Sequence, residues 1–181
     1  SQFHLDLANA ATLPTPDFDK TAAILPYLVR TQGLGVFYGE AGLGKTFAVE
    51  SGLPELDVRS CSVEFAPRVT TKQMTSTLLE VVSGRQHQGT RDELLHELRC
   101  VLADGPLLLK VDEAQRLDHC CIETLRYLYD QPATRITLVL VGGHGCWETV
   151  SRYPMVRSRV SGCAKFRPLD EHHVTKLIPS L

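Results

Sequence analysis

One short stretch of the chain combines glycines, a lysine and a threonine at a spacing that can hold phosphate groups. Residues 39–46 read Gly-Glu-Ala-Gly-Leu-Gly-Lys-Thr, between an apolar run at 34–38 and a helix-compatible run at 47–51. Glycines let successive backbone N–H groups turn inward around an anion, and a following helix adds its partial positive end. Lys45 would supply a charge for the β- and γ-phosphates of a nucleotide, and the Thr46 hydroxyl would bind Mg²⁺. A glycine-rich turn that contains Lys-Thr by chance is the alternative, which this strand and helix context disfavours.

Two acidic residues follow another apolar run and supply the remaining chemistry of a triphosphate site. Asp112 and Glu113 come directly after residues 107–111, which read Leu-Leu-Leu-Lys-Val. Asp112 would hold Mg²⁺ through water or through the Thr46 hydroxyl, and Glu113 would orient or deprotonate the attacking water. A helix cap is the alternative interpretation of an Asp-Glu pair. Lys110 departs from the pattern, because that position is normally apolar in a buried strand. It would either extend to an edge or pair with an acid.

An arginine-containing segment lies well after the glycine loop. Residues 154–160 combine a proline, apolar residues and two arginines. Arg159 could reach the γ-phosphate of a neighbouring subunit and stabilise charge in the transition state. A solvated or salt-bridged surface arginine is an equally good interpretation from chemistry alone. Arg157 and Arg152 are the alternative candidates.

These residues together predict ATP and Mg²⁺ as cofactors. Catalysis is assigned to Lys45, Glu113 and Arg159, and metal binding to Thr46 and Asp112. The residues expected to contact the nucleotide are Gly39, Glu40, Ala41, Gly42, Leu43, Gly44, Lys45, Thr46 and Phe47.

The elements that must position these residues follow from hydrophobic spacing. Near-continuous apolar runs predict buried parallel strands, and apolar residues at helical spacing predict the helices between them. Strands are expected at 34–38, 56–65, 107–111, 136–141 and, weakly, 163–166. Helices are expected from Asp17 or Asp19 to about residue 32, kinked or split at Pro26 and ended by Gly33; at 47–51, 70–83 and 92–103; after a cap at Asp118; through Trp147 and Val150; and after a cap at Asp170.

Strands that alternate with helices predict an α/β fold with a parallel five-stranded sheet, and the glycine loop at 39–46 makes this a three-layer P-loop NTPase core. Ligands of such sheets bind at the carboxyl ends of the strands. The glycine loop, Asp112-Glu113 and Gly142-Gly143 all follow predicted strands directly. The sequence therefore places three separate features on one rim of the sheet.

Composition excludes several classes of protein. The chain has 181 residues, of which 43% are apolar and 22% charged, which is ordinary for one globular α/β domain. The expected organisation is a lead-in and helix at 1–32, a nucleotide-binding core at 33–169 and the start of a truncated lid at 170–181. No apolar run approaches the ~20 residues of a membrane helix, and no leader is present, so no membrane insertion is expected. The 6 cysteines form no C-x-x-C pair, which predicts a reducing cytoplasm without disulfides.

Charge limits how the chain could meet a nucleic acid. Nineteen basic and 21 acidic side chains give a net charge of -2, so any such contact must be local. Residues 68–72 open a helix with Arg, Thr, Thr and Lys, and Arg85, His87 and Arg91 form a second basic loop. Both segments are better explained as solvated charges unless the protein assembles around a duplex. His172-His173 has no third ligand nearby, so no metal site is expected there.

The set of motifs resembles the AAA+ ATPases. The stretches that carry the resemblance are the glycine loop at 39–46, Asp-Glu-Ala-Gln-Arg-Leu at 112–117, Glu-Thr-Leu-Arg-Tyr-Leu-Tyr-Asp at 123–130, Leu-Val-Leu-Val-Gly at 138–142 and Ser-Arg at 158–159. Within these ATPases the chain is similar to the branch that holds the transposition regulators MuB, TniB and TnsC and the secretion ATPase ExeA.

The resemblance implies an ATP-dependent homo-oligomer, a ring or filament on double-stranded DNA that recruits or activates a transposase. It implies that Lys45 and Thr46 bind phosphate and Mg²⁺, that Asp112 and Glu113 serve hydrolysis, and that Arg159 acts as an arginine finger on the neighbouring subunit. The chain departs from the family at Gly143, with His144 beside it, where a sensor Asn, Thr or Ser is usual. It also ends soon after Asp170, where a helical lid normally follows.

Three functions remain open at this point. The first is a DNA-associated regulator of transposition. The second is an ExeA-like or signalling ATPase that acts on protein partners, which the near-neutral charge favours slightly. The third is a nucleotide switch that binds ATP but turns it over slowly, which Gly143 suggests.

Overall fold

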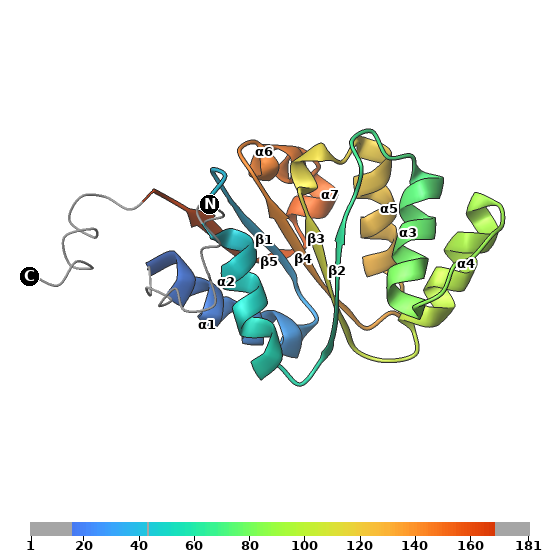
Figure 1. Ribbon diagram of the computed structural model, residues 1–181, viewed down its shortest axis with the longest axis horizontal. Coiled ribbons are helices and arrows are strands. Elements are labelled where there is room, and N and C mark those ends of the chain that lie inside the picture. The colour runs from blue at the N-terminus through green and yellow to red at the C-terminus, as the bar shows by residue number, and fades with distance from the viewer. Residues whose placement is uncertain (1–15, 43, 169–181) are drawn as a thin grey trace, which may run out of the picture.

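A parallel sheet forms the centre of the computed structural model, which describes residues 16–42 and 44–168. Its 5 strands lie in the order β2-β3-β4-β1-β5 (Figure 1). All neighbouring strands run parallel. The strands are β1 Leu34–Gly39, β2 Arg59–Glu64, β3 Leu107–Asp112, β4 Ile136–Gly142 and β5 Val160–Phe166. The predicted α/β fold with its five-stranded parallel sheet is confirmed.

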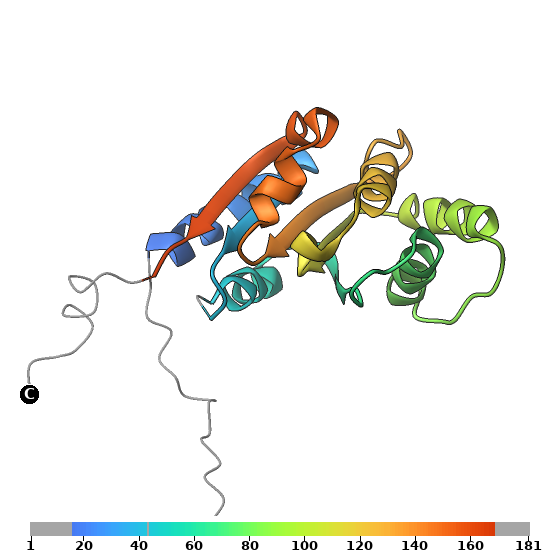
Figure 2. The same cartoon turned by 90° about the horizontal axis from the view of Figure 1, so that it is seen from above.

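Helices cover both faces of the sheet, which gives three layers (Figure 2). One face packs against α1 Pro16–Thr31 and α2 Lys45–Gly52. The other face packs against α3 Thr71–Ser83, α4 Arg91–Leu102, α5 His119–Tyr129, α6 Cys146–Ser151 and α7 Pro154–Arg157. Two 3-10 turns, η2 Leu53–Glu55 and η3 Ala114–Arg116, complete the described elements. Figures 1 and 2 both place α1 and α4 at opposite ends of the molecule.

The strand β3 shows how alternation divides the core. Leu107, Leu109 and Val111 belong to the larger apolar core under α3, α4 and α5, while Leu108 belongs to the core under α1 and α2. Successive side chains of a strand point to opposite faces, so one strand serves both cores. Lys110 lies between Leu109 and Val111 in the strand, so its side chain points to the same face as that of Leu108, and it is 0% exposed. The strand β3 therefore carries a fully buried cation.

Two strands differ in extent from the sequence prediction. β2 begins at Arg59 rather than at residue 56, because Leu56 and Val58 pack against the α1–α2 core without joining the sheet. β5 begins at Val160 rather than at Cys163, and it pairs with β1 from Leu34 onward. Hydrophobic spacing missed the first part of β5 because its residues at 161 and 162 are serine and glycine.

The first helix also differs from expectation. α1 continues through Pro26 as one helix and ends at Thr31, and Gln32, just before Gly33, takes a left-handed conformation with a backbone φ of 50°. Asp17 lies inside the first turn, where its carboxylate accepts a hydrogen bond of 2.9 Å from the backbone N–H of Arg167 at the end of β5. Asp17 therefore joins the start of α1 to the residue that follows β5, and it does not cap the helix.

Several sequence predictions fall outside the described residues. These are the lead-in before Pro16, the cap at Asp170, the pair His172-His173 and the start of the lid at 170–181. The predicted cap at Asp118 is confirmed, since its carboxylate accepts a hydrogen bond of 2.8 Å from the N–H of Cys121.

Within residues 16–42 and 44–168, no helix combines the length and apolar character needed to cross a membrane. The 6 cysteines are all free thiols. Burial raises the pKa of both Cys121 and Cys146 to about 12, so neither ionises near neutral pH.

Candidate nucleotide-binding site

The carboxyl ends of β1, β3 and β4 meet around a cavity of about 680 Å³. Its lining brings together the glycine loop, the acidic pair at the end of β3 and the glycines at the end of β4, as the spacing along the chain predicts. The lining residues are Glu40, Ala41, Gly42, Gly44, Lys45, Thr46, Phe47, Asp112, Glu113, Gln115, Val141, Gly142, Gly143 and His144. Leu43, also predicted to contact the nucleotide, lies outside the described residues.

The glycine loop has the backbone shape of an anion cradle. Gly42 and Gly44 have φ angles of 78° and 77°, and no atom lies within 4 Å of the position that a Cβ would take at either residue. Left-handed residues of this kind turn neighbouring N–H groups toward a common centre. α2 begins directly after Gly44, so its amino end faces the same space.

Gly39 has a packing role at the base of the loop, and its predicted contact with the nucleotide stays a prediction. It is not among the residues that line the cavity. A Cβ at this position would lie 2.3 Å from the backbone oxygen of Phe166 in β5. Gly39 therefore lets β5 approach the end of β1 closely, and its lack of a side chain serves packing at the base of the loop.

Lys45 lies inside the loop rather than on the surface. It is 8% exposed, and its ammonium group donates a hydrogen bond back to the carbonyl oxygen of Glu40. Burial lowers the pKa of Lys45, and the negative charge of Glu113 offsets part of that effect. A cation held in a partly dehydrated loop interacts strongly with phosphate oxygens, since little water screens the charge.

Thr46 and Asp112 offer oxygen ligands at the mouth of the loop. The hydroxyl Oγ1 of Thr46 donates a hydrogen bond of 3.3 Å to Oδ1 of Asp112. Hydroxyl and carboxylate oxygens are ligands that Mg²⁺ accepts, and this ion takes most of its remaining ligands from water and phosphates. The two residues fit a magnesium ion that is held jointly with a nucleotide.

The second oxygen of Asp112 faces the buried Lys110. The ammonium of Lys110 lies 2.9 Å from Oδ2 of Asp112 and 2.6 Å from Oε1 of Glu50 in α2. Of the two possibilities that the sequence left open, pairing with an acid is confirmed. The ion pair joins α2, which follows the glycine loop, to the end of β3, so both halves of the site share one buried contact.

Glu113 stands at the start of η3 with a left-handed backbone, at a φ of 53°. It makes no side-chain cap bond to that turn, so the helix-cap interpretation is wrong for this residue. Its carboxylate accepts a hydrogen bond of 2.6 Å from Nε2 of Gln115, and Arg116 lies 3.4 Å away. The carboxylate lines the cavity and is 39% exposed, so water can reach it.

Gln115 is a residue of the site that sequence reasoning did not assign. Besides its contact with Glu113, its Oε1 accepts a hydrogen bond of 2.9 Å from the N–H of Gly143, after β4. The Asp-Glu-Ala-Gln stretch contained this residue, but periodicity does not reveal a contact that crosses 28 residues of sequence.

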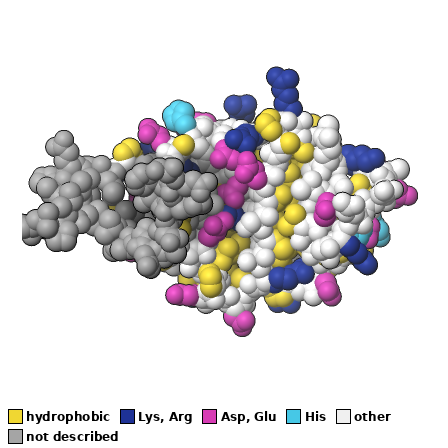
Figure 3. All heavy atoms as spheres, viewed as in Figure 1, with side chains coloured by type: hydrophobic (Ala, Val, Ile, Leu, Met, Phe, Trp, Pro, Cys, Tyr) yellow, Lys and Arg dark blue, Asp and Glu magenta, His cyan; other side chains and the backbone are white. Residues whose placement is uncertain are grey.

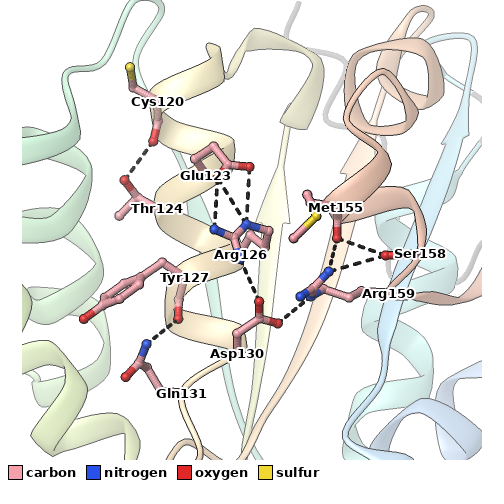
Figure 4. A network of polar contacts seen from close by, with 10 residues as sticks. All are labelled: Cys120, Glu123, Thr124, Arg126, Tyr127, Asp130, Gln131, Met155, Ser158 and Arg159. Carbon is pink, nitrogen blue, oxygen red and sulfur yellow. Dashed lines mark hydrogen bonds and ion pairs between the residues drawn. The ribbon is translucent and has the colours of Figure 1, made fainter.

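Arg159 lies apart from the cavity. It immediately precedes Val160, the first residue of β5, whereas the cavity lies at the carboxyl ends of the strands. Its Nε donates to Oδ1 of Asp130 at 2.5 Å, and its Nη1 donates to the carbonyl oxygen of Met155 (Figure 4). Within one subunit, Arg159 is thus a salt-bridged arginine near the amino end of β5, away from the carboxyl ends of the strands where the cavity lies.

Asp130 connects Arg159 to a second arginine. Its other oxygen accepts a hydrogen bond of 2.8 Å from Arg126, which also pairs with Glu123 (Figure 4). Burial alone would raise the pKa of Asp130, but hydrogen bonds and charge from Arg159 and Arg126 lower it overall. The Leu-Arg-x-Leu-x-Asp stretch at residues 125–130 therefore supplies the carboxylate that fixes Arg159.

In the two basic segments, at residues 68–72 and 85–91, some side chains form hydrogen bonds or ion pairs within the protein. Thr70 caps α3 and forms a reciprocal pair of hydrogen bonds with Gln73. His87 is 8% exposed and bridges Ser83 and Glu97, each at 2.8 Å, so the expectation of a solvated charge is wrong for this residue. The face shown in Figure 3 carries scattered Lys and Arg side chains interspersed with Asp and Glu.

A parallel sheet with a glycine loop after β1 and an acidic pair after β3 defines a phosphate-loop nucleotide-binding fold of the α/β class. Residues 29–150 match the family described as AAA domain, which is more than half of the chain. The chain belongs to this AAA domain family.

Solved structures agree on the fold. The chain is similar to Cdc6p from Pyrobaculum aerophilum, with 19% identity and a TM-score of 0.69 over 88% of this chain and 46% of that one. It is also similar to Orc1 from Aeropyrum pernix, solved in complex with DNA, with 20% identity, a TM-score of 0.64 and the same coverage of 88% and 46%. A third similar structure is the RuvB Holliday junction branch migration motor of Thermotoga maritima, with 14% identity and a TM-score of 0.59 over 91% of this chain and 49% of that one. The chain thus spans about half the length of these three proteins. Among curated proteins, none matches the sequence.

Proposed function

We propose that this protein binds ATP with Mg²⁺, hydrolyses it, and acts as a DNA-associated regulator of transposition in the cytoplasm. The observation that supports the ATPase most strongly is the convergence of Lys45, Thr46, Asp112 and Glu113 on one cavity. Residues of these types supply a phosphate cation, two magnesium ligands and a base, the set that phosphoryl transfer to water requires.

Each residue has a separate task in this proposal. The loop N–H groups and Lys45 hold the phosphates, while Thr46 and Asp112 hold the magnesium ion. When bound, the ion neutralises charge that develops on the phosphate oxygens. Glu113 lines the same cavity with a partly exposed carboxylate, from which it can orient water and accept its proton.

Arg159 is proposed to act on the nucleotide of a neighbouring subunit. Its place at the amino end of β5 keeps it away from the cavity of its own chain, which favours a role across an interface. Asp130 would hold the guanidinium in a fixed orientation. A homo-oligomer, as a ring or a filament, follows from this assignment.

Mixing two inactive variants tests the role of Arg159. Subunits with Arg159→Ala, mixed with subunits with Glu113→Gln, should regain part of the ATPase activity. In a random equal mixture about one quarter of the interfaces pair an intact Glu113 with an intact Arg159. The measurement is phosphate release across mixing ratios, with Arg157→Ala as the matched control. Absence of recovery at every ratio would remove Arg159 from catalysis.

Binding to DNA is proposed from one similar structure. Orc1 of Aeropyrum pernix was solved in complex with DNA and shares this fold at 20% identity. The net charge of -2 means that contacts must come from a local surface formed on assembly. Recruitment of a transposase rests on the resemblance of the motifs alone.

Retention on random duplex DNA tests this part of the proposal. Binding should require ATP rather than ADP, and log Kobs should fall by about 0.9 per contacted phosphate for each tenfold rise in salt. Fluorescence anisotropy over a salt series measures that slope. If the protein with ATP is not retained at low salt, the transposition proposal is wrong.

A second candidate is an ATPase that acts on protein partners, such as the ExeA-like or signalling type. The internal contacts of Thr70 and His87 favour it, because they occupy two of the polar side chains that could have faced DNA. DNA-independent ATPase activity, together with no retention on DNA, would support this candidate.

A further inference from the structure

We propose that Gln115 positions the carboxylate of Glu113 and couples it to the loop after β4. This inference rests on the proposed ATPase function. The resemblance to the AAA+ ATPases implies a polar sensor side chain after β4, where this chain has Gly143. The amide of Gln115 lies at that place, reaching it from η3. Gln115 is therefore a positioning residue for the proposed base.

The orientation of the Gln115 amide is fixed by its two partners. The N–H of Gly143 can only donate, and an ionised carboxylate of Glu113 can only accept. The amide oxygen must therefore face Gly143, at 2.9 Å, and the amide nitrogen must face Glu113, at 2.6 Å. If the amide were turned over, its NH₂ group would face the N–H of Gly143 and its oxygen would face the carboxylate of Glu113. Only the arrangement observed satisfies both contacts.

Gly142, the last residue of β4, and Gly143, which follows it, provide the space for this amide. A Cβ at Gly142 would lie 2.5 Å from Oε1 of Gln115 and 2.5 Å from Sγ of Cys146. A Cβ at Gly143 would lie 3.3 Å from Nε2 of Gln115. A side chain after β4 would compete with Gln115 for the same volume, so this chain has the glutamine in place of such a side chain.

Glu113 depends on such a contact more than most residues would. A φ of 53° is uncommon for a residue other than glycine, and it persists where surrounding contacts determine it. Arg116, the other partner, is 3.4 Å away, 41% exposed and shared with Glu64. The shorter contact from Gln115 thus does most to hold the carboxylate toward the cavity.

Two substitutions of Gln115 test whether its contact with Glu113 serves catalysis or only folding. Gln115→Glu keeps the size of the side chain and an acceptor for the Gly143 N–H, but it replaces the donor to Glu113 with a second carboxylate that repels it. Gln115→Ala loses both contacts. We expect kcat to fall by about 10- to 100-fold in both variants, with KM and ATP affinity unchanged, because positioning of the base affects the transition state.

Hydrogen exchange at the Gly143 amide gives a second readout that does not depend on activity. Exchange should become faster in Gln115→Ala and stay slow in Gln115→Glu. Adding Gly143→Asn to Gln115→Ala should restore part of kcat, since the new side chain enters the space that the alanine leaves. Thermal denaturation of each variant serves as the control for folding.

The outcomes distinguish this inference from the proposed function. If the wild-type protein binds and hydrolyses ATP while Gln115→Glu retains full kcat, the positioning role is wrong and the ATPase stands. If Gly143 exchange is unchanged in Gln115→Ala, the coupling is wrong as well. If the wild-type protein neither binds nor hydrolyses ATP, both proposals fail.

Discussion

Replacing Glu113 with glutamine should lower ATP turnover by about 100-fold or more while leaving ATP affinity unchanged. The amide has nearly the same size as the carboxylate but cannot accept a proton from water. The phosphate-holding residues, including Lys45, are untouched by this change. Phosphate release measures turnover, and titration with a fluorescent ATP analogue measures affinity.

Matched variants make this result specific. Glu80→Gln is the same chemical change at an exposed residue of α3 that does not line the cavity, and it should leave turnover near the wild-type value. Lys45→Ala should instead lose nucleotide binding, since it removes the buried cation of the loop. Normal hydrolysis by Glu113→Gln would show that another group acts as the base.

Neutralising both acids around Lys110 should destabilise the protein by about 3 kcal/mol. In the double variant Glu50→Gln with Asp112→Asn, the ammonium stays at 0% exposure without a carboxylate partner. A buried charge without a partner costs far more than a neutral side chain of similar size. Urea denaturation of the nucleotide-free protein measures the free energy of unfolding.

Adding Lys110→Met to that double variant should recover most of the lost stability. Methionine fills a similar volume and leaves no charge to compensate, so the three changes together cost less than the first two. The single change Lys110→Met provides the reference for packing alone. A triple variant no more stable than the double variant would mean that the ion pair does not stabilise the fold.

Local sequence was sufficient for the features that depend on neighbouring residues. The glycine loop at 39–46, the acidic pair Asp112-Glu113 and the cap at Asp118 all follow from short-range spacing. The order of strands and helices also follows, since apolar runs must be buried on a sheet. These features place the cavity at the carboxyl edge without knowledge of any long-range contact.

The ends of strands were harder to predict from the sequence, because apolar residues can pack outside a strand and small or polar residues can pair within one. Leu56 is apolar yet lies outside β2, while the serine and glycine at 161–162 belong to β5. Hydrophobicity reports burial, whereas a strand is defined by backbone pairing. The two coincide only where the strand is central in the sheet.

The sequence by itself determined the chemistry available to this protein: a phosphate loop, two acids and a parallel sheet that brings them to one edge. Only the tertiary structure decided which side chains hold those groups in place. Lys110 meets Glu50 across 60 residues, and Gln115 meets Gly143 across 28. Such contacts depend on how helices and strands pack in space, and no periodicity along the chain encodes them.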